Sequence, residues 1–176
     1  MAAMKKKLIW ALGIVICLVS ACVKPGSSSD TTCNYTDSPV VAPANEIDSV
    51  KKYLNLHSIS ATQHSSGFFY TINPQGTGLA ISNLCSILTV RYNGRLTNGS
   101  VFDSTTAGNT SAFRLGEVIT GWQKGLPLIS KGGKITLYIP PTLGFGSTDR
   151  KNNAGVVIIP ANSIVIFDVE LVDIAN

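Results

Sequence analysis

The sequence predicts an α+β domain in which a mostly antiparallel sheet wraps around one short helix. Three observations favour this fold. Runs of aromatic and β-branched residues recur from residue 67 onward, and Asn98-Gly99 between two apolar residues is the strongest short hairpin signal in the chain. Only the interval 117–126 offers a helix between the later strands. A length of 176 residues fits one such domain.

The first expected element is a helix over 45–56 that precedes the sheet. Asn45 is the expected N-cap. The apolar side chains repeat at helical spacing on one face: Ile47, Val50, Tyr53 and Leu54. We expect this face to dock on the domain that follows, although a partner-binding helix would show the same pattern.

Short apolar runs predict the strands of the sheet. The expected strands are 68–72, 85–92, 134–139 and 164–172. In 85–92 the residues alternate, and the apolar face carries Leu88, Val90 and Tyr92. The interval 117–126 can form only a short helix, because Gly121, Gly125 and Pro127 interrupt it.

The N-terminus resembles a bacterial lipoprotein signal. Three lysines precede an uncharged run over 8–19, which as a helix spans about 18 Å and is too short for a hydrocarbon core of about 30 Å. The run ends in Ser20-Ala21-Cys22, which is similar to a lipobox, so we expect Cys22 to carry lipid. An ordinary signal peptide with a cysteine near its cleavage site is the alternative.

The predicted organisation has four parts. A signal peptide over 1–21 precedes the lipidated cysteine and a flexible Pro/Gly/Ser tether over 22–44. A helical extension over 45–66 then leads into the main domain over 67–176. We expect an exported protein anchored by lipid in the bacterial envelope, on the periplasmic side of the outer membrane, because no strongly acidic run follows Cys22.

The charge of the chain lies largely in the predicted signal. Removing residues 1–21 takes away three lysines and no acid, so the net charge falls from +4 to +1. A nearly neutral protein lacks the positive surface that binds nucleic acid, and we expect no such partner.

Two cysteines remain in the predicted mature chain, Cys33 and Cys85. An even pair in an exported protein favours a disulfide bond, and two independent thiols are the alternative. His57 and His64 share no ligand spacing with the cysteines, so we expect no metal site.

The sequence offers few groups for acid–base or nucleophilic chemistry. No Ser/His/Asp set stands out, and the run 131–134 (KGGK) lacks P-loop spacing. Asp168 and Glu170 alternate with apolar residues and fit the solvent face of a strand. The remaining aromatic and aliphatic residues point to a site that works by being apolar.

Six segments, in order, resemble the motifs of the FKBP-type peptidyl-prolyl cis–trans isomerases. They are 90–94 (VRYNG), 101–104 (VFDS), 116–122 (GEVITGW), 139–146 (IPPTLGFG), 158–160 (IIP) and 166–171 (IFDVEL). The resemblance covers roughly residues 84–172. It implies a half-open antiparallel sheet, a half-barrel curled around a short helix, with an apolar pocket between them. The helix and strand at 45–73 are similar to the N-terminal extension of lipoprotein members.

The resemblance also implies the site and its chemistry. The implied catalytic residues are Tyr92, Phe102, Asp103, Val118, Ile119, Trp122, Phe145, Ile159 and Phe167, with Phe113 and Ile158 as further substrate contacts. Trp122 would be the floor under the proline ring, Asp103 would form a hydrogen bond across the pocket, and the Ile159 N–H would hold the substrate chain. The implied reaction is rotation about X–Pro bonds of polypeptide clients without a cofactor. A membrane-tethered chaperone that binds clients through the same pocket without turnover is the alternative.

Two features depart from the family pattern. Phe145 stands where the family usually has a tyrosine whose hydroxyl donates to a bound carbonyl, so we expect weakened binding of macrolide inhibitors. The loop over 147–157 is longer than in compact members, and we expect it to overhang the pocket.

Overall fold

The structure is a computed structural model that describes residues 33–176. The predicted signal peptide over 1–21, the lipidation site Cys22 and the tether as far as residue 32 lie outside the described residues. Within 33–176, no helix is long and apolar enough to cross a membrane.

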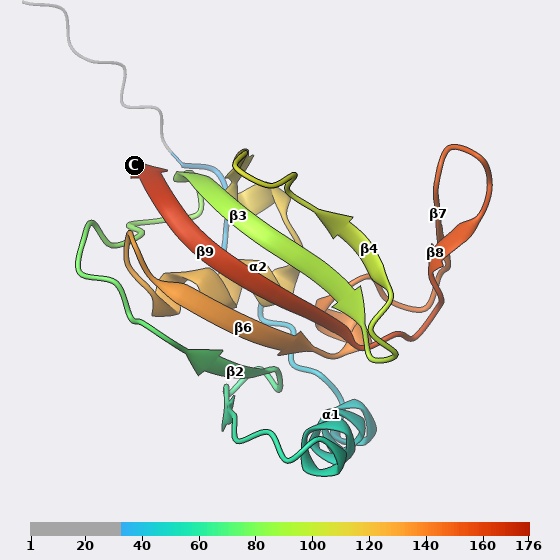
Figure 1. The fold of residues 1–176 in the computed structure, drawn as a ribbon. Helices are drawn as coiled ribbons and strands as arrows, with labels where there is room; N and C mark the ends of the chain where they lie inside the picture. The colour runs from blue at the N-terminus through green and yellow to red at the C-terminus, as the bar shows by residue number, and fades with distance from the viewer. Residues whose placement is uncertain (1–32) are drawn as a thin grey trace, which may run out of the picture. The chain divides into compact units, whose positions relative to one another are not determined.

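A curved antiparallel sheet forms the body of the described part (Figure 1). Its strands lie in the order β1 (Thr62–Gln63), β2 (Phe69–Ile72), β6 (Lys134–Ile139), β9 (Val165–Ala175), β3 (Ile87–Leu96) and β4 (Val101–Ser104), and β5 (Ser111–Arg114) pairs with β3 beside β4. A separate hairpin joins β7 (Arg150–Lys151) to β8 (Val157–Ile159). The α+β prediction with an antiparallel sheet is confirmed.

Helices lie on both faces of this sheet. The helix α2 (Thr120–Gly125), flanked by the 3₁₀ turns η1 (Leu115–Glu117) and η2 (Leu126–Leu128), packs on the face that carries Leu137 and Phe167. The helix α1 (Ala44–Leu56) packs on the opposite face, which carries their neighbours Tyr138 and Ile166. The prediction that α1 docks on the domain through Val50 and Leu54 is correct, because both side chains are buried.

Two glycines bring α2 close to the sheet. A Cβ atom on Gly121 would lie 2.7 Å from Ile139, and one on Gly125 would lie 2.6 Å from Leu137. Both residues therefore sit inside the helix at its contact with β6, whereas the sequence suggested that they interrupt it. Their missing side chains set how near Trp122 comes to the strands.

The start of α1 differs from the prediction. The N-cap is Pro43, whose carbonyl accepts from the N–H groups of Glu46 and Ile47, and Asn45 lies inside the helix. Glu46 is the acid of the first turn, and its two carboxylate oxygens accept from the N–H and the hydroxyl of Thr142 at 2.9 and 2.8 Å. This contact ties α1 to the 3₁₀ turn η3 (Pro141–Leu143).

Residues 33–43 are attached to the domain at three points, where the sequence predicted a tether through residue 44, although most of the stretch is exposed. The structure contains a Cys33–Cys85 disulfide bond with a Cα–Cα distance of 5.6 Å. Tyr35 lies against Gly116, and Ala42 is buried and donates its N–H to the Ser66 carbonyl. A covalent bond and two packed side chains therefore hold a stretch whose composition alone suggested flexibility.

We expect the disulfide bond to contribute measurably to the free energy of unfolding. It closes a loop of sequence separation 52, for which loop-closure entropy gives about 4 kcal/mol. We expect Cys33→Ser with Cys85→Ser to lower the free energy of unfolding by about 2–4 kcal/mol in urea titrations. Reduction of the unaltered chain should shift the midpoint equally, and an unchanged midpoint would contradict the bond.

Candidate functional site

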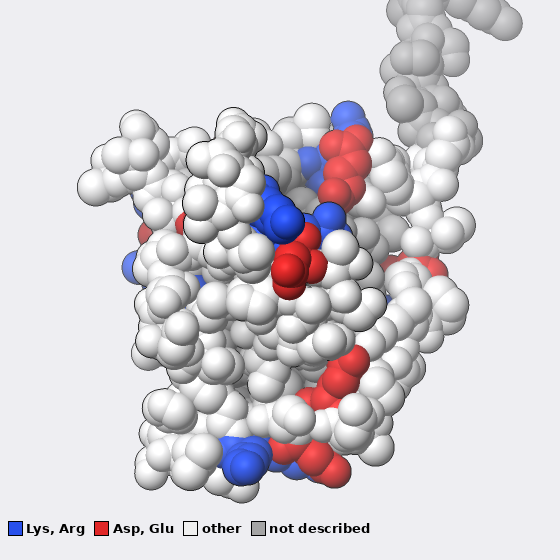
Figure 2. Space-filling view, turned by 90° about the vertical axis from the view of Figure 1, so that its right-hand side faces the viewer, with Lys and Arg blue, Asp and Glu red and all other residues white. Residues whose placement is uncertain are grey.

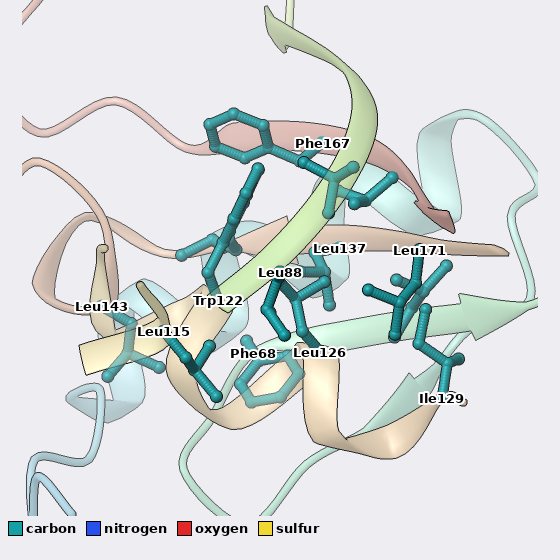
Figure 3. Packing of buried hydrophobic residues seen from close by; sticks show 14 of the residues in the cluster. Phe68, Leu88, Leu115, Trp122, Leu126, Ile129, Leu137, Leu143, Phe167 and Leu171 are labelled. Carbon is teal, nitrogen blue, oxygen red and sulfur yellow. The ribbon is translucent and has the colours of Figure 1, made fainter. Parts of the chain in front are cut away.

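Four aromatic side chains meet where α2 faces the sheet. Trp122 extends from α2 toward Phe167 on β9, above the aliphatic core (Figure 3). The ring centroid of Trp122 lies 5.1 Å from Phe167, 5.4 Å from Tyr92 on β3 and 5.8 Å from Phe113 on β5, all with interplanar angles above 80°. Such edge-to-face contacts are a favoured geometry of aromatic pairs. We call these four residues the aromatic cluster.

A second pair of rings extends the cluster along the sheet. Phe102 on β4 packs edge-to-face against Phe167 at 5.5 Å and against Phe145, which follows η3, at 6.0 Å. The rings of Phe102 and Phe167 pass directly over Gly94 of β3. A Cβ atom on Gly94 would lie 2.7–2.8 Å from both rings, so this position has room only for hydrogen.

A cavity of about 280 Å³ opens among these rings. It is lined by Tyr92, Asp103, Phe113, Glu117, Val118, Ile119, Trp122, Phe145 and Phe167. Eight of these nine residues are among the site residues predicted from the sequence. They come from β3, β4, β5, β9, α2 and the segments beside the 3₁₀ turns, so only the closed sheet brings them together.

Three predicted residues do not line the cavity. Phe102 stands behind Phe145 and Phe167 as a support. Ile159 is buried in the main core at 3% exposure, and Ile158 is half-buried against the same core. The proposed substrate-holding role of the Ile159 N–H therefore remains a prediction.

Glu117 lines the cavity and was missed from the sequence. An exposed acid beside a short helix carries no signal of its own. Its position within 116–122, directly before Val118 and Ile119, is the signal that could have identified it.

One hydrogen bond crosses the polar edge of the cavity. The Tyr92 hydroxyl donates to Asp103 Oδ2 at 2.7 Å. Burial, and next the hydrogen bond and charge of Asp103, raise the pKa of Tyr92 well above its ordinary value, so the hydroxyl keeps its proton. The Asp103 carboxylate oxygen is thereby engaged and fixes the orientation of the Tyr92 ring.

The floor of the cavity contains an unpaired donor. Trp122 is 4% exposed, and its buried Nε1 has no hydrogen-bond partner among the described residues. Its neighbours are aromatic rings, which accept N–H groups only weakly. The surroundings of Trp122 are therefore almost entirely apolar.

A different groove lies on the other face of the sheet. It has a volume of about 540 Å³ and is lined by charged strand residues, including Arg91, Lys134 and Glu170. Glu170 pairs with Arg91 at 3.6 Å and with Lys134 at 3.8 Å, so its carboxylate offsets part of their positive charge. On the face shown in Figure 2, too, acidic and basic side chains occur in small mixed groups on a mostly uncharged surface. The apolar cavity is the stronger candidate for the site.

The loop over 147–157 does not overhang the cavity as expected. It forms the β7–β8 hairpin, whose tip is exposed and projects away from the sheet (Figure 1), and none of its residues lines the cavity. Arg150 of this hairpin places its guanidinium 5.8 Å from the Phe145 ring centroid. The residues by which this loop is longer than in compact members form their own hairpin, in which β7 pairs with β8. Within residues 33–176, no group of three or more metal-ligating side chains occurs.

Comparison with known proteins identifies the family motifs. The family model for FKBP-type peptidyl-prolyl cis-trans isomerases matches residues 82–172. The FKBP-type isomerase FkpA of Buchnera aphidicola from Schizaphis graminum is 48% identical over 128 residues, covering 72% of this chain and 48% of the relative. FkpA of Escherichia coli K12 is 44% identical over 111 residues, covering 62% and 38%. The chain thus spans about half or less of the length of these curated relatives.

Solved structures agree with the fold. The crystal structure of Escherichia coli FkpA matches with a TM-score of 0.62 and 39% identity, over 74% of this chain and 60% of the other. The crystal structure of AtFKBP13 matches with a TM-score of 0.59 and 34% identity, over 66% of this chain and 99% of the other.

Gly94 lies directly beneath two rings of the site, so we expect the site to be sensitive to substitution there. Gly94→Ala should displace the rings of Phe102 and Phe167 and lower the affinity for a proline-containing peptide about tenfold. Overpacking should also lower the free energy of unfolding by about 1–3 kcal/mol. Gly108→Ala is the matched control, because a Cβ there meets nothing within 4 Å and only its φ of +82° is strained. Equal ligand affinity in the two variants, measured by calorimetry, would contradict this assignment.

Proposed function

The chain belongs to the family of FKBP-type peptidyl-prolyl cis-trans isomerases, and on this basis we propose that it accelerates rotation about X–Pro bonds in polypeptide clients. The observation that carries the proposal is the apolar, aromatic-lined cavity with Trp122 as its floor. The family describes the activity, and this site has the size and polarity for a proline ring and its flanking backbone.

The chemistry of the reaction suits such a cavity. Rotation about the X–Pro bond breaks amide resonance, with a barrier of about 18–20 kcal/mol. The twisted amide has less charge separation than the planar one, so an apolar cavity favours the transition state over the ground state. Lowering the barrier by about 5–8 kcal/mol would accelerate the rotation roughly 10⁴–10⁶-fold. No proton has to move to or from the protein.

In the proposed reaction, the polar groups of the cavity hold the surrounding side chains in place and transfer no proton. The Tyr92 hydroxyl stays protonated and is held by Asp103, so the pair orients the ring and contributes no base. Trp122 offers a flat face for the proline ring, held by its contacts with Phe113 and Phe167. The Ile159 N–H is the proposed donor to the substrate chain.

Macrolide binding is proposed to be weak. Phe145 lines the cavity without the hydroxyl that a tyrosine would present to a bound carbonyl. Losing one such hydrogen bond weakens binding by about 0.5–1.5 kcal/mol. Proline ligands that bind mainly through the apolar floor should lose less affinity from the missing hydroxyl.

The proposal is tested by an isomerisation assay. We expect the full chain to speed the cis-to-trans conversion of a Leu-Pro tetrapeptide, and Trp122→Leu and Asp103→Ala each to lower kcat/KM by about tenfold or more, which is about 1.4 kcal/mol of transition-state binding. Trp122→Phe is the milder variant: it keeps an aromatic ring at the floor but is smaller than the indole and lacks the unpaired N–H, so we expect it to lose less activity than Trp122→Leu. Activity that survives both damaging variants would refute the site. Peptide binding without turnover in the unaltered chain would instead support a client-binding chaperone.

We further propose that the protein is exported and lipid-anchored through Cys22, on the periplasmic side of the outer membrane. The support is the signal-like run followed by Ser20-Ala21-Cys22. Clients would then be other exported proteins that fold near the membrane.

Anchoring is tested at the proposed lipidation site. We expect Cys22→Ala to move the protein from the membrane pellet to the soluble fraction and to remove the mass of the lipid, while isomerase activity persists. Continued fractionation of the variant with membranes would contradict lipid attachment at Cys22.

A further inference from the structure

One wall of the cavity is a short loop whose support comes from the N-terminal segment. Glu117, the last residue of η1, and Val118 and Ile119, which lead to α2, line the cavity. Within the described residues, one backbone hydrogen bond joins Val118 and Ile119 to η1, from the Val118 N–H to the Leu115 carbonyl at 3.5 Å. The position of this wall therefore depends on contacts from elsewhere.

Tyr35 supplies the contact on the outer side of the wall. A Cβ atom on Gly116 would lie 2.4 Å from the Tyr35 ring, so the ring rests directly on the Gly116 backbone. The Tyr35 hydroxyl donates to Glu117 Oε1 at 2.7 Å. Tyr35 follows the disulfide-bonded Cys33 by two residues, so the ring cannot move far from this place.

Two other side chains contact the same wall. Gln123 Nε2 of α2 donates to the Val118 carbonyl at 2.8 Å and to the Gly116 carbonyl at 3.3 Å. Arg114 lies 3.4 Å from the carboxylate oxygen of Glu117 that Tyr35 also contacts. Tyr35, Gln123 and Arg114 together form the side-chain contacts that hold this wall.

We propose that Tyr35 is a positioning residue for the cavity, acting through Gly116 and Glu117 to hold the wall 117–119 against a bound proline. The inference rests on the proposed function for its substrate class. The packing of the Tyr35 ring on Gly116 explains why Tyr35, although 38% exposed, forms a specific hydrogen bond with Glu117, 82 residues further along the chain. Misplacement of a wall by about 1 Å is enough to cost substantial activity.

The contact persists over the pH range of an assay. The hydrogen bond from Tyr35 to Glu117 is the main cause that raises the pKa of the Tyr35 hydroxyl above its ordinary value. The donor therefore stays protonated at neutral pH, and we expect its contribution to binding to be constant between pH 6 and about pH 9.

The test uses the tryptophan in the cavity floor. The chain has two tryptophans, and Trp10 lies in the predicted signal peptide, so Trp10→Phe leaves Trp122 as the sole reporter of ligand binding even in precursor that keeps residues 1–21. In this full-length background, fluorescence titration with a Leu-Pro tetrapeptide gives Kd, and the isomerisation assay gives kcat and KM. We expect Tyr35→Phe to raise Kd and KM about fivefold, as for the loss of one hydrogen bond, with kcat changed less. Tyr35→Ala should raise them further.

Two controls separate positioning from general stability. Tyr53→Ala removes a half-buried tyrosine of α1 that contacts His57 and Tyr138 and lies outside the cavity lining, so it should lower the melting temperature and leave Kd unchanged. In a Glu117→Ala background, Tyr35→Phe should have no further effect on Kd, because its partner is gone.

Each outcome decides the proposal. An unchanged Kd in Tyr35→Ala, or an equal effect of Tyr35→Phe with and without Glu117, would overturn it. Absence of turnover in the unaltered chain would refute the isomerase proposal alone, since the fluorescence titration still measures whether Tyr35 positions the cavity.

Discussion

The edge-to-face contacts of Trp122 with Tyr92, Phe113 and Phe167 are the interaction on which the rest of the described structure depends. Each partner comes from a different strand, so the contacts form only when the sheet closes over α2. Aromatic pairs of this geometry contribute about 0.5–1.5 kcal/mol each beyond their buried area. The same rings that complete the core thereby leave the cavity open on their outer side.

That arrangement requires small residues at defined positions. Gly121 and Gly125 let α2 approach β6, and Gly94 lets the rings of Phe102 and Phe167 come close to the backbone of β3. A methyl group at any of the three would meet a neighbouring carbon at less than 3 Å. The apolar cavity thus depends on side chains that pack directly against glycine backbone, as well as on the aromatic rings themselves.

Segments that precede the main sheet support both ends of the cavity. The contact between Glu46 of α1 and Thr142 holds η3, which leads to Phe145. The contact between Tyr35 and Glu117 holds the wall beside α2. Tyr35 and Glu46 thus join the N-terminal segment to the pocket, where composition had suggested a flexible tether followed by a docked helix.

Local pattern predicted the elements of the fold well. The alternation over 85–92 correctly placed Leu88 and Val90 in the core, and the Asn98-Gly99 turn lies between β3 and β4 with Gly99 at φ +87°. Predictions made from neighbouring residues in the sequence fail where a contact with a residue far along the chain decides the local structure. Asn45 is not the N-cap because Pro43 already ends the extended segment that the disulfide and Ala42 hold in place.

The sequence by itself determined where the main strands lie along the chain, because alternation of apolar and polar residues is a local property. It also contained the family motifs, and through them eight of the nine residues that line the cavity, because motif spacing is local as well. Only the tertiary structure decided that Ile159 is buried in the core, that Phe102 supports the wall from behind, and that Glu117 and Tyr35 meet. Contacts between residues 82 positions apart depend on how the sheet curves and where the disulfide holds the N-terminal segment, and no spacing along the chain encodes that geometry.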